Sequence, residues 1–414
     1  MNHFVVDANQ RSTALQVSTH ASGFSAELQR IRRHLHRFPE LSEHEHETTR
    51  FLAGEVSQMD LVAELANDQR GLWVDIGSGD RCVAIRGDID ALPIQEDFDR
   101  GYCSEIEGVM HACGHDAHAT TALGAGMIIK RMDALGQLPH PTRVRVLLQP
   151  AEETSTGGLH MIRSGALDGV DAAVSLHVDP TRSAGQIGVR SGSFTAGCQL
   201  FRVTFDGRSG HSSRPHLTDD CIAALAAWIN QAYIRVPRCH DVLEPMVLSV
   251  GQVSGGNAAN VIPRHAELRG TLRAVTDSAM ASALGCLEKL NRSIEQTHGC
   301  KIVWQVEQSA PALINDAAVT ELIQRSGIEL LGSQNVLPIA NPSMGAEDFA
   351  FIAEKVPAAM FRLGIAGAQI GSAPLHTPQF DIDESALPIG AAVLAAAAIA
   401  CCDPNVDLPS PSSS

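Results

Sequence analysis

The sequence predicts an α/β fold in which a mixed sheet lies between helices and is interrupted by a smaller α+β module. Three observations support this prediction. Short buried strand-like runs alternate with helical periods along most of the chain, the pattern changes to clean strand alternation near residue 195, and the first pattern returns near residue 310. Buried strands with intervening helices are typical of a sheet covered on both faces. The length of 414 residues suits two or three domains.

The main domain is expected to be discontinuous and to consist of residues 24–194 and 310–402. Runs such as CVAIRG and RVRVLLQ are short and apolar, as in buried strands, whereas AELQRIRRHLHRF has apolar residues at helical spacing. The expected strands are 71–77, 82–87, 143–149, 172–176 and 358–364, and the expected helices are 26–38, 46–56, 120–135, 317–331, 346–355 and 386–402.

The inserted module is expected to span residues 195–309, in the order strand, helix, two strands, helix, strand. That order is typical of a ferredoxin-like α+β unit. Residues 1–23 are mostly polar and residues 403–414 are rich in Pro and Ser, so both are interpreted as flexible tails. The expected elements of the module are strands 200–207, 246–253, 265–275 and 301–308 and helices 219–236 and 279–298.

Composition argues against nucleic-acid binding, secretion and a membrane span. A formal net charge of -16 argues against non-specific nucleic-acid binding, which requires positive surface. The N-terminus has no basic region followed by an apolar core, so no secretory signal is expected. The Ala-rich segment 386–402 is short and fits a buried helix better than a membrane span. Ten cysteines without paired spacing indicate a reducing, cytoplasmic location.

The segment His111–His118 reads His-Ala-Cys-Gly-His-Asp-Ala-His and is the most informative part of the chain. Imidazole and thiolate are the side chains that bind borderline divalent metals. If Cys113-Gly114-His115 is extended, the alternation of a strand points Cys113 and His115 in the same direction. Gly114 would let the backbone turn tightly beside an ion.

Further candidate ligands follow predicted strands or lie in a loop, which is where ligands bind in open α/β sheets. Alone, each has a plainer explanation, such as a structural histidine or a solvated acid, but their joint placement favours one shared site. The segment His44–Glu47 lacks the two-histidine spacing of a metalloprotease helix and is interpreted as a solvated face. The candidates are Asp88, Asp90, Glu152, Glu153, His177 and His376.

Nine motifs occur in order between Phe24 and Cys402: LHRFPELSEHEHET, RGDIDALPIQE, MHACGHDAHAT, LQPAEE, SLHVDP, GHSSRPHL, NVIPRHAELRGTLR, GAEDFA and LHTPQFDID. Together they resemble the peptidase M20 superfamily, and specifically its amidohydrolase branch of hippurate hydrolases, N-acyl-amino-acid amidohydrolases and auxin-conjugate hydrolases. The resemblance implies a zinc-peptidase-like catalytic domain with an inserted satellite domain. It also implies a homodimer or larger homo-oligomer formed through that satellite domain.

The resemblance further implies two divalent metal ions, with Mn²⁺, Zn²⁺, Ni²⁺ and Co²⁺ as candidates, and Glu152 as the general base. Asp88-Ile89-Asp90 stands where the superfamily usually has His-x-Asp, so a first histidine ligand is absent. Asp88, Asp90 and Asp116 are expected to orient the ligands, as such sites require. The implied ligands are Cys113, as the bridge, with His115, Glu153, His177 and His376.

Three residues of the inserted module match substrate-contacting positions of the branch. His211 matches a histidine that reaches a neighbouring active site and polarises the scissile carbonyl, in its own or a partner subunit. Asn260 and Arg273 match positions that hold a free carboxylate. The structural alternatives are that Asn260 is a turn residue and that Arg273 is a cation on a strand surface. The implied reaction is hydrolysis of the amide bond of N-acyl amino acids, hippurate-like or N-acetylated.

Three alternatives remain open at this point. Cys113 could act as the nucleophile of an amidase with His115 as its base, which chelators would not inhibit. The chain could also be a dipeptidase or an aminoacylase of another substrate class. A non-catalytic protein of the same fold is a third alternative, which turnover of any N-acyl amino acid would eliminate.

Overall fold

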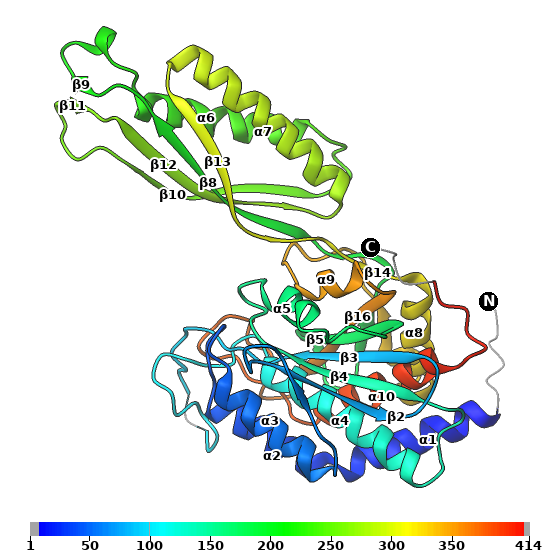
Figure 1. Cartoon of the computed structure of the whole chain (residues 1–414). Coiled ribbons are helices and arrows are strands. Elements are labelled where there is room, and N and C mark those ends of the chain that lie inside the picture. The colour runs from blue at the N-terminus through cyan, green and yellow to red at the C-terminus, as the bar shows by residue number, and fades with distance from the viewer. Residues whose placement is uncertain (1–7, 99, 410–414) are drawn as a thin grey trace. The chain divides into compact units, whose positions relative to one another are not determined.

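The computed structural model describes residues 8–98 and 100–409. Within these, the chain forms two compact units, both visible in Figure 1. Unit 1 consists of the residues up to Gly192, Ile314–Asn341 and the residues from Asp348 onward, and unit 2 consists of Ser193–Leu313 and Pro342–Glu347.

Unit 1 is built on a mixed eight-stranded sheet of order β1-β2-β4-β3-β5-β16-β6-β15, which confirms the predicted α/β class. β3 runs parallel to β4 and β5, and β5 runs parallel to β16, whereas β2 is antiparallel to β4. The carboxyl ends of the central parallel strands therefore meet at one edge of the sheet. The strands are β1 (Glu64–Leu65), β2 (Leu72–Gly77), β3 (Cys82–Asp88), β4 (Arg143–Gln149), β5 (Ala172–Ser183), β6 (Ile187–Val189), β15 (Val336–Pro338) and β16 (Ala358–Ala366).

Helices cover both faces of this sheet: Figure 1 shows α5 and α9 on one face and α1, α2, α4 and α10 on the other. A Cβ at Gly124 of α4 would lie 2.6 Å from Leu28 and 3.1 Å from Ala391, so a glycine here lets α2, α4 and α10 pack closely. The helices are α1 (Ala8–Gly23), α2 (Ser25–Arg37), α3 (His46–Gln58), α4 (His115–Ala134), α5 (Gly157–Arg163), α8 (Ala317–Leu331), η3 (Ser333–Asn335), α9 (Phe349–Ala353) and α10 (Ala386–Cys402).

The Ala-rich helix α10 is buried in unit 1, as its composition predicted. Its alanines pack against α4 and α8 because small side chains allow neighbouring helices to approach. Among the described residues, no helix is both long and apolar enough to cross a membrane. The predicted helix 346–355 is wrong in its extent, since only Phe349–Ala353 is helical there.

The expectation that residues 1–23 form a flexible tail is wrong for the part that the structure describes. Residues 8–23 form α1, and Val17 is fully buried in the core of unit 1. The segment after α10 is also anchored, because the Arg81 guanidinium donates to the carbonyl groups of Cys401, Asp403 and Val406. Residues 1–7 and 410–414 lie outside the described residues.

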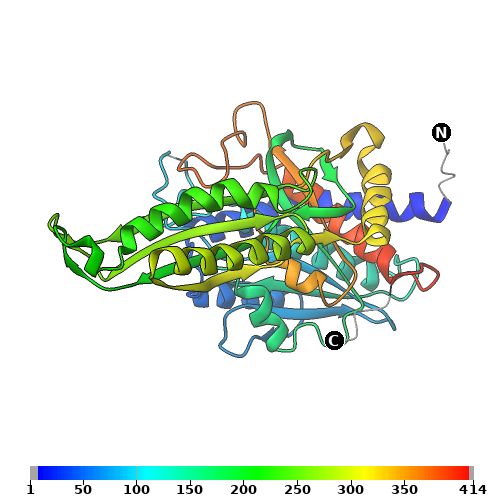
Figure 2. The same ribbon diagram turned by 90° about the horizontal axis from the view of Figure 1, so that it is seen from above.

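Unit 2 has an antiparallel sheet of order β10-β12-β8-β13, with α6 and α7 side by side over one face (Figure 2). The βαββαβ sequence of these elements and the central place of β8 and β12 confirm the ferredoxin-like prediction. The elements are β8 (Gly197–Asp206), β9 (Gly210–His211), η1 (Pro215–Leu217), α6 (Cys221–Arg235), η2 (Val236–Arg238), β10 (Met246–Gly255), β11 (Val261–Ile262), β12 (His265–Ala274), α7 (Asp277–His298) and β13 (Lys301–Ala310).

Local sequence explains where the helices of unit 2 begin and end. The Asp220 carboxylate caps α6 by accepting from the amides of Ile222 and Ala223, and Thr276 caps α7 in the same manner. Gly299 ends α7 in the left-handed conformation, with φ of 76°. Aromatic packing of Phe201 against Trp304 supports the sheet behind them, with ring centroids 4.1 Å apart.

The division into units differs from the expected boundaries 195–309, because unit 2 spans Ser193–Leu313 and includes a second segment. Residues 342–347, distant in sequence, belong to unit 2 because the Ala196 amide donates to the carbonyl of Ser343 and Arg273 donates to the carbonyl of Met344. The chain passes from one unit to the other at β7 (Gly192–Thr195) and again at β14 (Leu313–Asn315), and these two strands pair with each other.

We predict that Val17→Ala lowers the free energy of unfolding by about 2 kcal/mol, because it removes two buried methyl groups from the packing of α1. The measurement is the midpoint of urea unfolding at constant slope. Val62→Ala, at a site that is 88% exposed, is the matched control and should leave the midpoint unchanged. Equal midpoints for the two variants would show that α1 is not part of the cooperative core.

Candidate metal centre

The candidate ligands of unit 1 come from the carboxyl-terminal edge of its sheet and from the loops beside it. Glu152 and Glu153 follow β4, His177 lies in β5, and His376 lies in the loop after β16. The expectation that Cys113-Gly114-His115 is extended is wrong. Gly114 is left-handed, with φ of 87°, and His115 is the first residue of α4, so the two side chains converge at a helix start.

The structure brings all five predicted ligands and Glu152 together in overlapping groups. In each group the donor atoms lie within 4.8 Å of one another. The Cys113 Sγ lies between two histidines, 3.6 Å from His177 Nε2 and 3.3 Å from His376 Nε2. The groups are Cys113 with His115 and His177, Cys113 with Glu153 and His376, and His115 with Glu152 and Glu153.

The unpaired atoms at this cluster are suited to a divalent metal ion. In the described part of the chain, His115 Nε2 and Glu153 Oε1 are buried without a hydrogen-bond partner. The Nδ1 of His115 donates to the Asp90 carbonyl at 2.9 Å, and the Nδ1 of His177 donates to the Val178 carbonyl at 2.8 Å. Each ring therefore turns the lone pair of Nε2 toward the cluster, as metal-binding histidines do.

Electrostatics oppose the alternative in which Cys113 is a free nucleophile. Burial, followed by the nearby Glu153 carboxylate, raises the pKa of the Cys113 thiol far above its ordinary value. A reactive cysteine needs the opposite environment, one that lowers the pKa and exposes the thiolate. Burial also holds the pKa of His177 well below its usual range, which keeps the ring neutral and able to bind a metal.

Asp90 and Asp88 lie directly behind the ligands. Asp90 accepts from His115 Nδ1 at 3.0 Å through one oxygen and from the Glu153 amide at 3.0 Å through the other. Asp88 accepts from His118 Nδ1 at 2.7 Å, and His118 Nε2 in turn accepts from the Val178 amide at 2.9 Å. Both nitrogens of His118 are therefore engaged, and this histidine supports the strand beside His177.

Asp116 lies next to His115 in sequence but its carboxylate faces α2. It accepts from Arg32 Nε at 2.7 Å and from His36 Nδ1 at 2.8 Å, all within the buried interior. The Arg32 guanidinium also pairs with Asp381 at 2.7 Å. The effect is to fix the first turn of α4, which carries His115, against α2 and the loop before α10.

His376 is placed by strained backbone. Its φ is 60°, the left-handed region that residues with a Cβ enter at a cost of about 1–3 kcal/mol. Its amide donates to the Ala112 carbonyl at 2.8 Å, which ties the loop to the residue before Cys113. The strain is therefore stored at the point where the last candidate ligand meets Cys113.

The three predicted residues of unit 2 do not all lie together within it. His211 in β9 pairs with Val261, and the Ser212 amide donates to the Asn260 carbonyl, so His211 and Asn260 are neighbours. Arg273 lies near the opposite end of β12, eight residues beyond His265, which is about 26 Å along a strand. Its guanidinium donates to the Met344 carbonyl at 2.8 Å.

One prediction from the sequence is wrong in a way that adds a residue near the site. Glu45 was interpreted as part of a solvated face, but its side chain is fully buried. Burial, with a smaller effect from the Asp90 carboxylate, raises the pKa of Glu45 to about 7. Nothing in the local hydrophobic pattern signalled this, because the segment His44–Glu47 has exposed residues on both sides of Glu45.

A second buried group was also not predicted from the sequence. The Arg86 guanidinium donates to Asp88 at 2.6 Å and to Asp348 at 2.8 Å, and Asp348 accepts from Gln149 and from the Gly158 amide. These contacts join β3, β4 and the start of α5 beneath the ligand-bearing edge. The GAEDFA motif thus supplies a structural carboxylate to unit 1.

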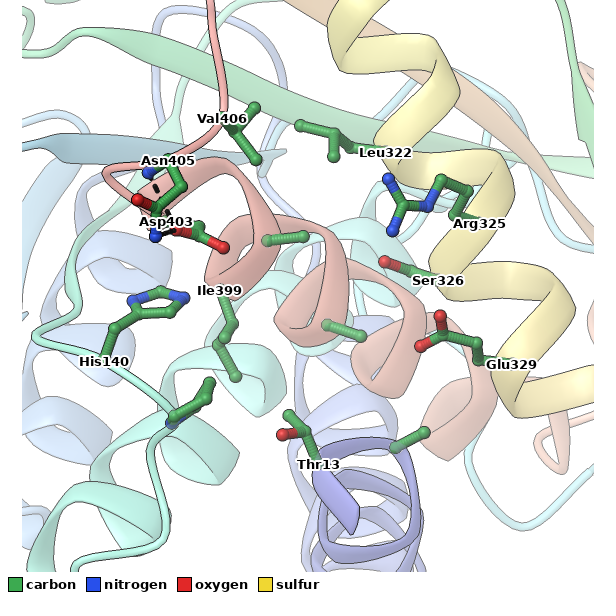
Figure 3. A pocket seen from close by; sticks show the side chains of 14 residues that line it. Thr13, His140, Leu322, Arg325, Ser326, Glu329, Ile399, Asp403, Asn405 and Val406 are labelled. Carbon is green, nitrogen blue, oxygen red and sulfur yellow. Dashed lines mark hydrogen bonds between the residues drawn. The ribbon is translucent and has the colours of Figure 1, made fainter. Parts of the chain in front are cut away.

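A cavity of about 340 Å³ lies elsewhere in unit 1, between α1, α8 and α10 (Figure 3). Figure 3 shows Arg325, Ser326 and Glu329 along α8 facing His140 and the segment from Asp403. None of the candidate ligands or catalytic residues lines it. The cavity is therefore separate from the candidate metal centre.

Residues 84–400 match the family described as Peptidase family M20/M25/M40. The chain belongs to this family. It is 38% identical over 90% of its length to IAA-amino acid hydrolase ILR1-like 6 of Arabidopsis thaliana, covering 79% of that protein. It is 34% identical over 86% of its length to N-acetyl-L-cysteine deacetylase of Bacillus subtilis, covering 84% of that protein.

A solved structure supports the same assignment. The YXEP protein of Bacillus subtilis, described as a dinuclear metal binding peptidase from the M20 family, superposes with a TM-score of 0.78 at 29% identity. The alignment covers 91% of this chain and 98% of that one. The resemblance to the M20 superfamily drawn from the nine motifs is thereby confirmed.

We predict that Glu45→Gln becomes more stable relative to the wild type as pH rises from 4.5 to 7. The raised pKa of Glu45 means that the folded protein holds a proton that the unfolded chain releases, so the wild type loses stability across this interval. At about 1.4 kcal/mol per pKa unit, the loss is at most roughly 3 kcal/mol. Urea unfolding at pH 4.5, 6 and 8 measures it, and parallel curves for both proteins would contradict it.

Proposed function

We propose that this protein is a metal-dependent amidohydrolase that cleaves the amide bond of N-acyl amino acids into a carboxylic acid and a free amino acid. The observation that carries the proposal is the convergence of Cys113, His115, Glu153, His177 and His376 on Glu152. The names of two relatives, an IAA-amino acid hydrolase and an N-acetyl-L-cysteine deacetylase, refer to amino acids that carry an acyl group.

The donor groups divide into two sets that share one sulfur. Cys113, His115 and His177 would hold one divalent ion, and Cys113, Glu153 and His376 would hold the other. The mixture of thiolate, imidazole and carboxylate suits Zn²⁺, Ni²⁺, Co²⁺ or Mn²⁺. When bound, such ions act as Lewis acids and lower the pKa of bound water to about 7.

Glu152 is placed to move the proton of the reaction. Its side chain is 10% exposed, its Oε2 lies 3.9 Å from His115 Nε2, and its Oε1 accepts from the Asp348 amide at 3.4 Å. Glu152 takes a proton from the attacking water at a carboxylate oxygen. The same proton then passes to the nitrogen of the leaving amino acid as the C–N bond breaks.

His211, Asn260 and Arg273 are proposed to bind the substrate. The Nδ1 of His211 accepts from the Ser213 amide at 3.1 Å, which leaves Nε2 of this exposed ring as the hydrogen-bond donor for a substrate carbonyl. Asn260 and Arg273 supply donors for the free carboxylate. Asn260 precedes β11 and lies beside His211, whereas Arg273 lies near the far end of β12, so joint action on one substrate favours a site completed by a second copy of the chain.

A homodimer through unit 2 is therefore part of the proposal. β10 is an edge strand that carries exposed Val247 and Val253, and the neighbouring helix α6 exposes Ile222, Tyr233 and Ile234. An exposed apolar edge strand is a template for pairing with another strand. All ten cysteines lie among the residues that the structure describes, and each is free. A reducing, cytoplasmic location is also part of the proposal.

The deciding experiment measures amino-acid release from N-acetyl, N-benzoyl and indole-acetyl amino acids. The chelated protein is assayed first, and then after addition of Mn²⁺, Zn²⁺, Co²⁺ or Ni²⁺. Release that only a metal restores supports the proposal and identifies the acyl class. Release that resists chelation supports Cys113 as the nucleophile. The absence of amino-acid release under every condition contradicts the proposal.

We predict that Glu152→Ala lowers kcat by 10²- to 10⁴-fold, the usual contribution of general acid–base catalysis, while two metal ions per chain remain bound. Steady-state kinetics and metal analysis of the same sample measure both quantities. Glu107→Ala, at an exposed glutamate, is the control and should match the wild type. Retained activity in Glu152→Ala would remove this residue from the mechanism.

We predict that Val253→Lys, a charge placed on the apolar edge of β10, converts the dimer into a monomer and lowers turnover with it. Light scattering after size-exclusion chromatography gives the mass of each variant at one concentration. Val303→Lys on β13, at the other edge of the same sheet, is the control and should remain dimeric. A wild type that is monomeric at micromolar concentration would contradict the dimer.

A further inference from the structure

The turn that carries Glu152 and Glu153 has an unusual backbone. Ala151, directly before Glu152, has φ of 53°, and Ser155 has φ of 52°. Residues with a Cβ occupy this region only where surrounding contacts impose it. The carbonyl of Ala151 accepts from the amides of Thr156 and Gly157, so the turn closes tightly on itself. The amide of Ala151 is bound by a group from another part of the chain.

That group is the carboxyl of Glu45. Its Oε1 accepts from the Ala151 amide at 2.7 Å, across 106 residues of sequence, from the residue that precedes α3. In the described part of the chain its other oxygen, Oε2, makes no hydrogen bond, and the closest cation is Arg70, whose Nη1 lies 3.7 Å away. Glu45 is fully buried and belongs to none of the metal-donor groups.

Asp90 holds the other end of the same turn. Its Oδ2 accepts from the Glu153 amide at 3.0 Å, and Ser42 donates to this oxygen at 2.7 Å. Glu45 and Asp90 thus fix the amides on either side of Glu152, one residue before it and one residue after it. The direction of the Glu152 side chain follows from these two anchors.

Burying a carboxyl costs more free energy than burying an apolar side chain. Burying it with one oxygen unsatisfied disfavours folding, and burial raises the pKa of Glu45 to about 7. What a carboxyl or carboxamide at this position offers, and an apolar side chain cannot, is an acceptor that reaches the Ala151 amide. The carboxyl therefore points to a role in placing the turn.

We propose that Glu45 is a positioning residue for the reaction: through the Ala151 amide it sets the left-handed turn that aims Glu152 at the substrate and Glu153 at the metal. This inference rests on the proposed amidohydrolase function. Glu45 acts through Ala151 and does not touch the reacting atoms, so its loss affects the rate and the metal affinity more than the binding of the substrate carboxylate.

The test compares Glu45→Gln, Glu45→Asp and Glu45→Ala. Gln keeps an acceptor oxygen at the same reach without a charge, Asp keeps the charge but retracts the acceptor by one methylene, and Ala removes both. We expect Gln to stay within about threefold of the wild type and Ala to lose 10- to 100-fold in kcat with KM nearly unchanged, the usual effect of losing a group that orients a metal ligand. Asp should fall between them.

A second readout does not depend on turnover. Competition with a chelator for Co²⁺ should show the weaker of the two ions bound about tenfold less tightly in Glu45→Ala, because Glu153 follows the same turn. Glu55→Ala is the matched control, since this buried glutamate of α3 pairs with Arg30 and should leave both readouts unchanged. If the wild type hydrolyses nothing, the proposed function fails, while this titration still decides the role of Glu45.

Two outcomes would overturn the inference. One is a folded Glu45→Ala with wild-type kcat and Co²⁺ affinity. The other is Glu45→Asp with full activity beside an impaired Glu45→Gln, which would mean that the charge matters and the reach of the acceptor does not. If Glu45→Ala fails to fold, the contrast between Gln and Asp still separates these cases, because both keep a polar side chain in the buried position.

Discussion

The hydrogen bonds of Asp90 are the constraint on which the candidate site depends. This single carboxylate, two residues after the end of β3, orients the His115 ring through one oxygen and holds the Glu153 amide through the other. It therefore couples a helix start to a strand end, two elements that are formed by unrelated parts of the sequence. Buried arginines support both sides: Arg32 pairs with Asp116 in the first turn of α4, and Arg86 of β3 donates to Gln149 at the end of β4. The order of the site thus reflects buried ionic contacts more than the local conformation of the ligands.

Much of the fold could be predicted from the sequence because it depends on short-range periodicity. Runs such as CVAIRG and RVRVLLQ are short, apolar and rich in β-branched residues, which favours buried strands, and both are strands. The helix α1 was not predicted, because most of its residues are polar and only a few of them, such as Val17, are buried. The membership of residues 342–347 in unit 2 was also missed, since it rests on two backbone contacts with no pattern in the sequence.

The site was predictable where residue type alone limits the chemistry, as with Cys113, His177 and the Glu152–Glu153 pair. It was less predictable where conformation decides the geometry. Gly114 places His115 at a helix start and not in a strand, although the two side chains converge in either case. Glu45 could not be found at all, because burial of one acid among exposed neighbours follows from how α3 meets the turn after β4.

The exposure of His376 has a consequence for the kinetics of metal exchange. His115 is almost fully buried, whereas the His376 side chain is 51% exposed and sits on strained backbone. Of the two ions proposed above, the one held with Glu153 and His376 would therefore be the more labile, since water reaches the His376 side chain and hardly reaches His115. Such inequality would let the protein carry two different metals at once, with the buried position retaining its ion while the outer one equilibrates with the medium.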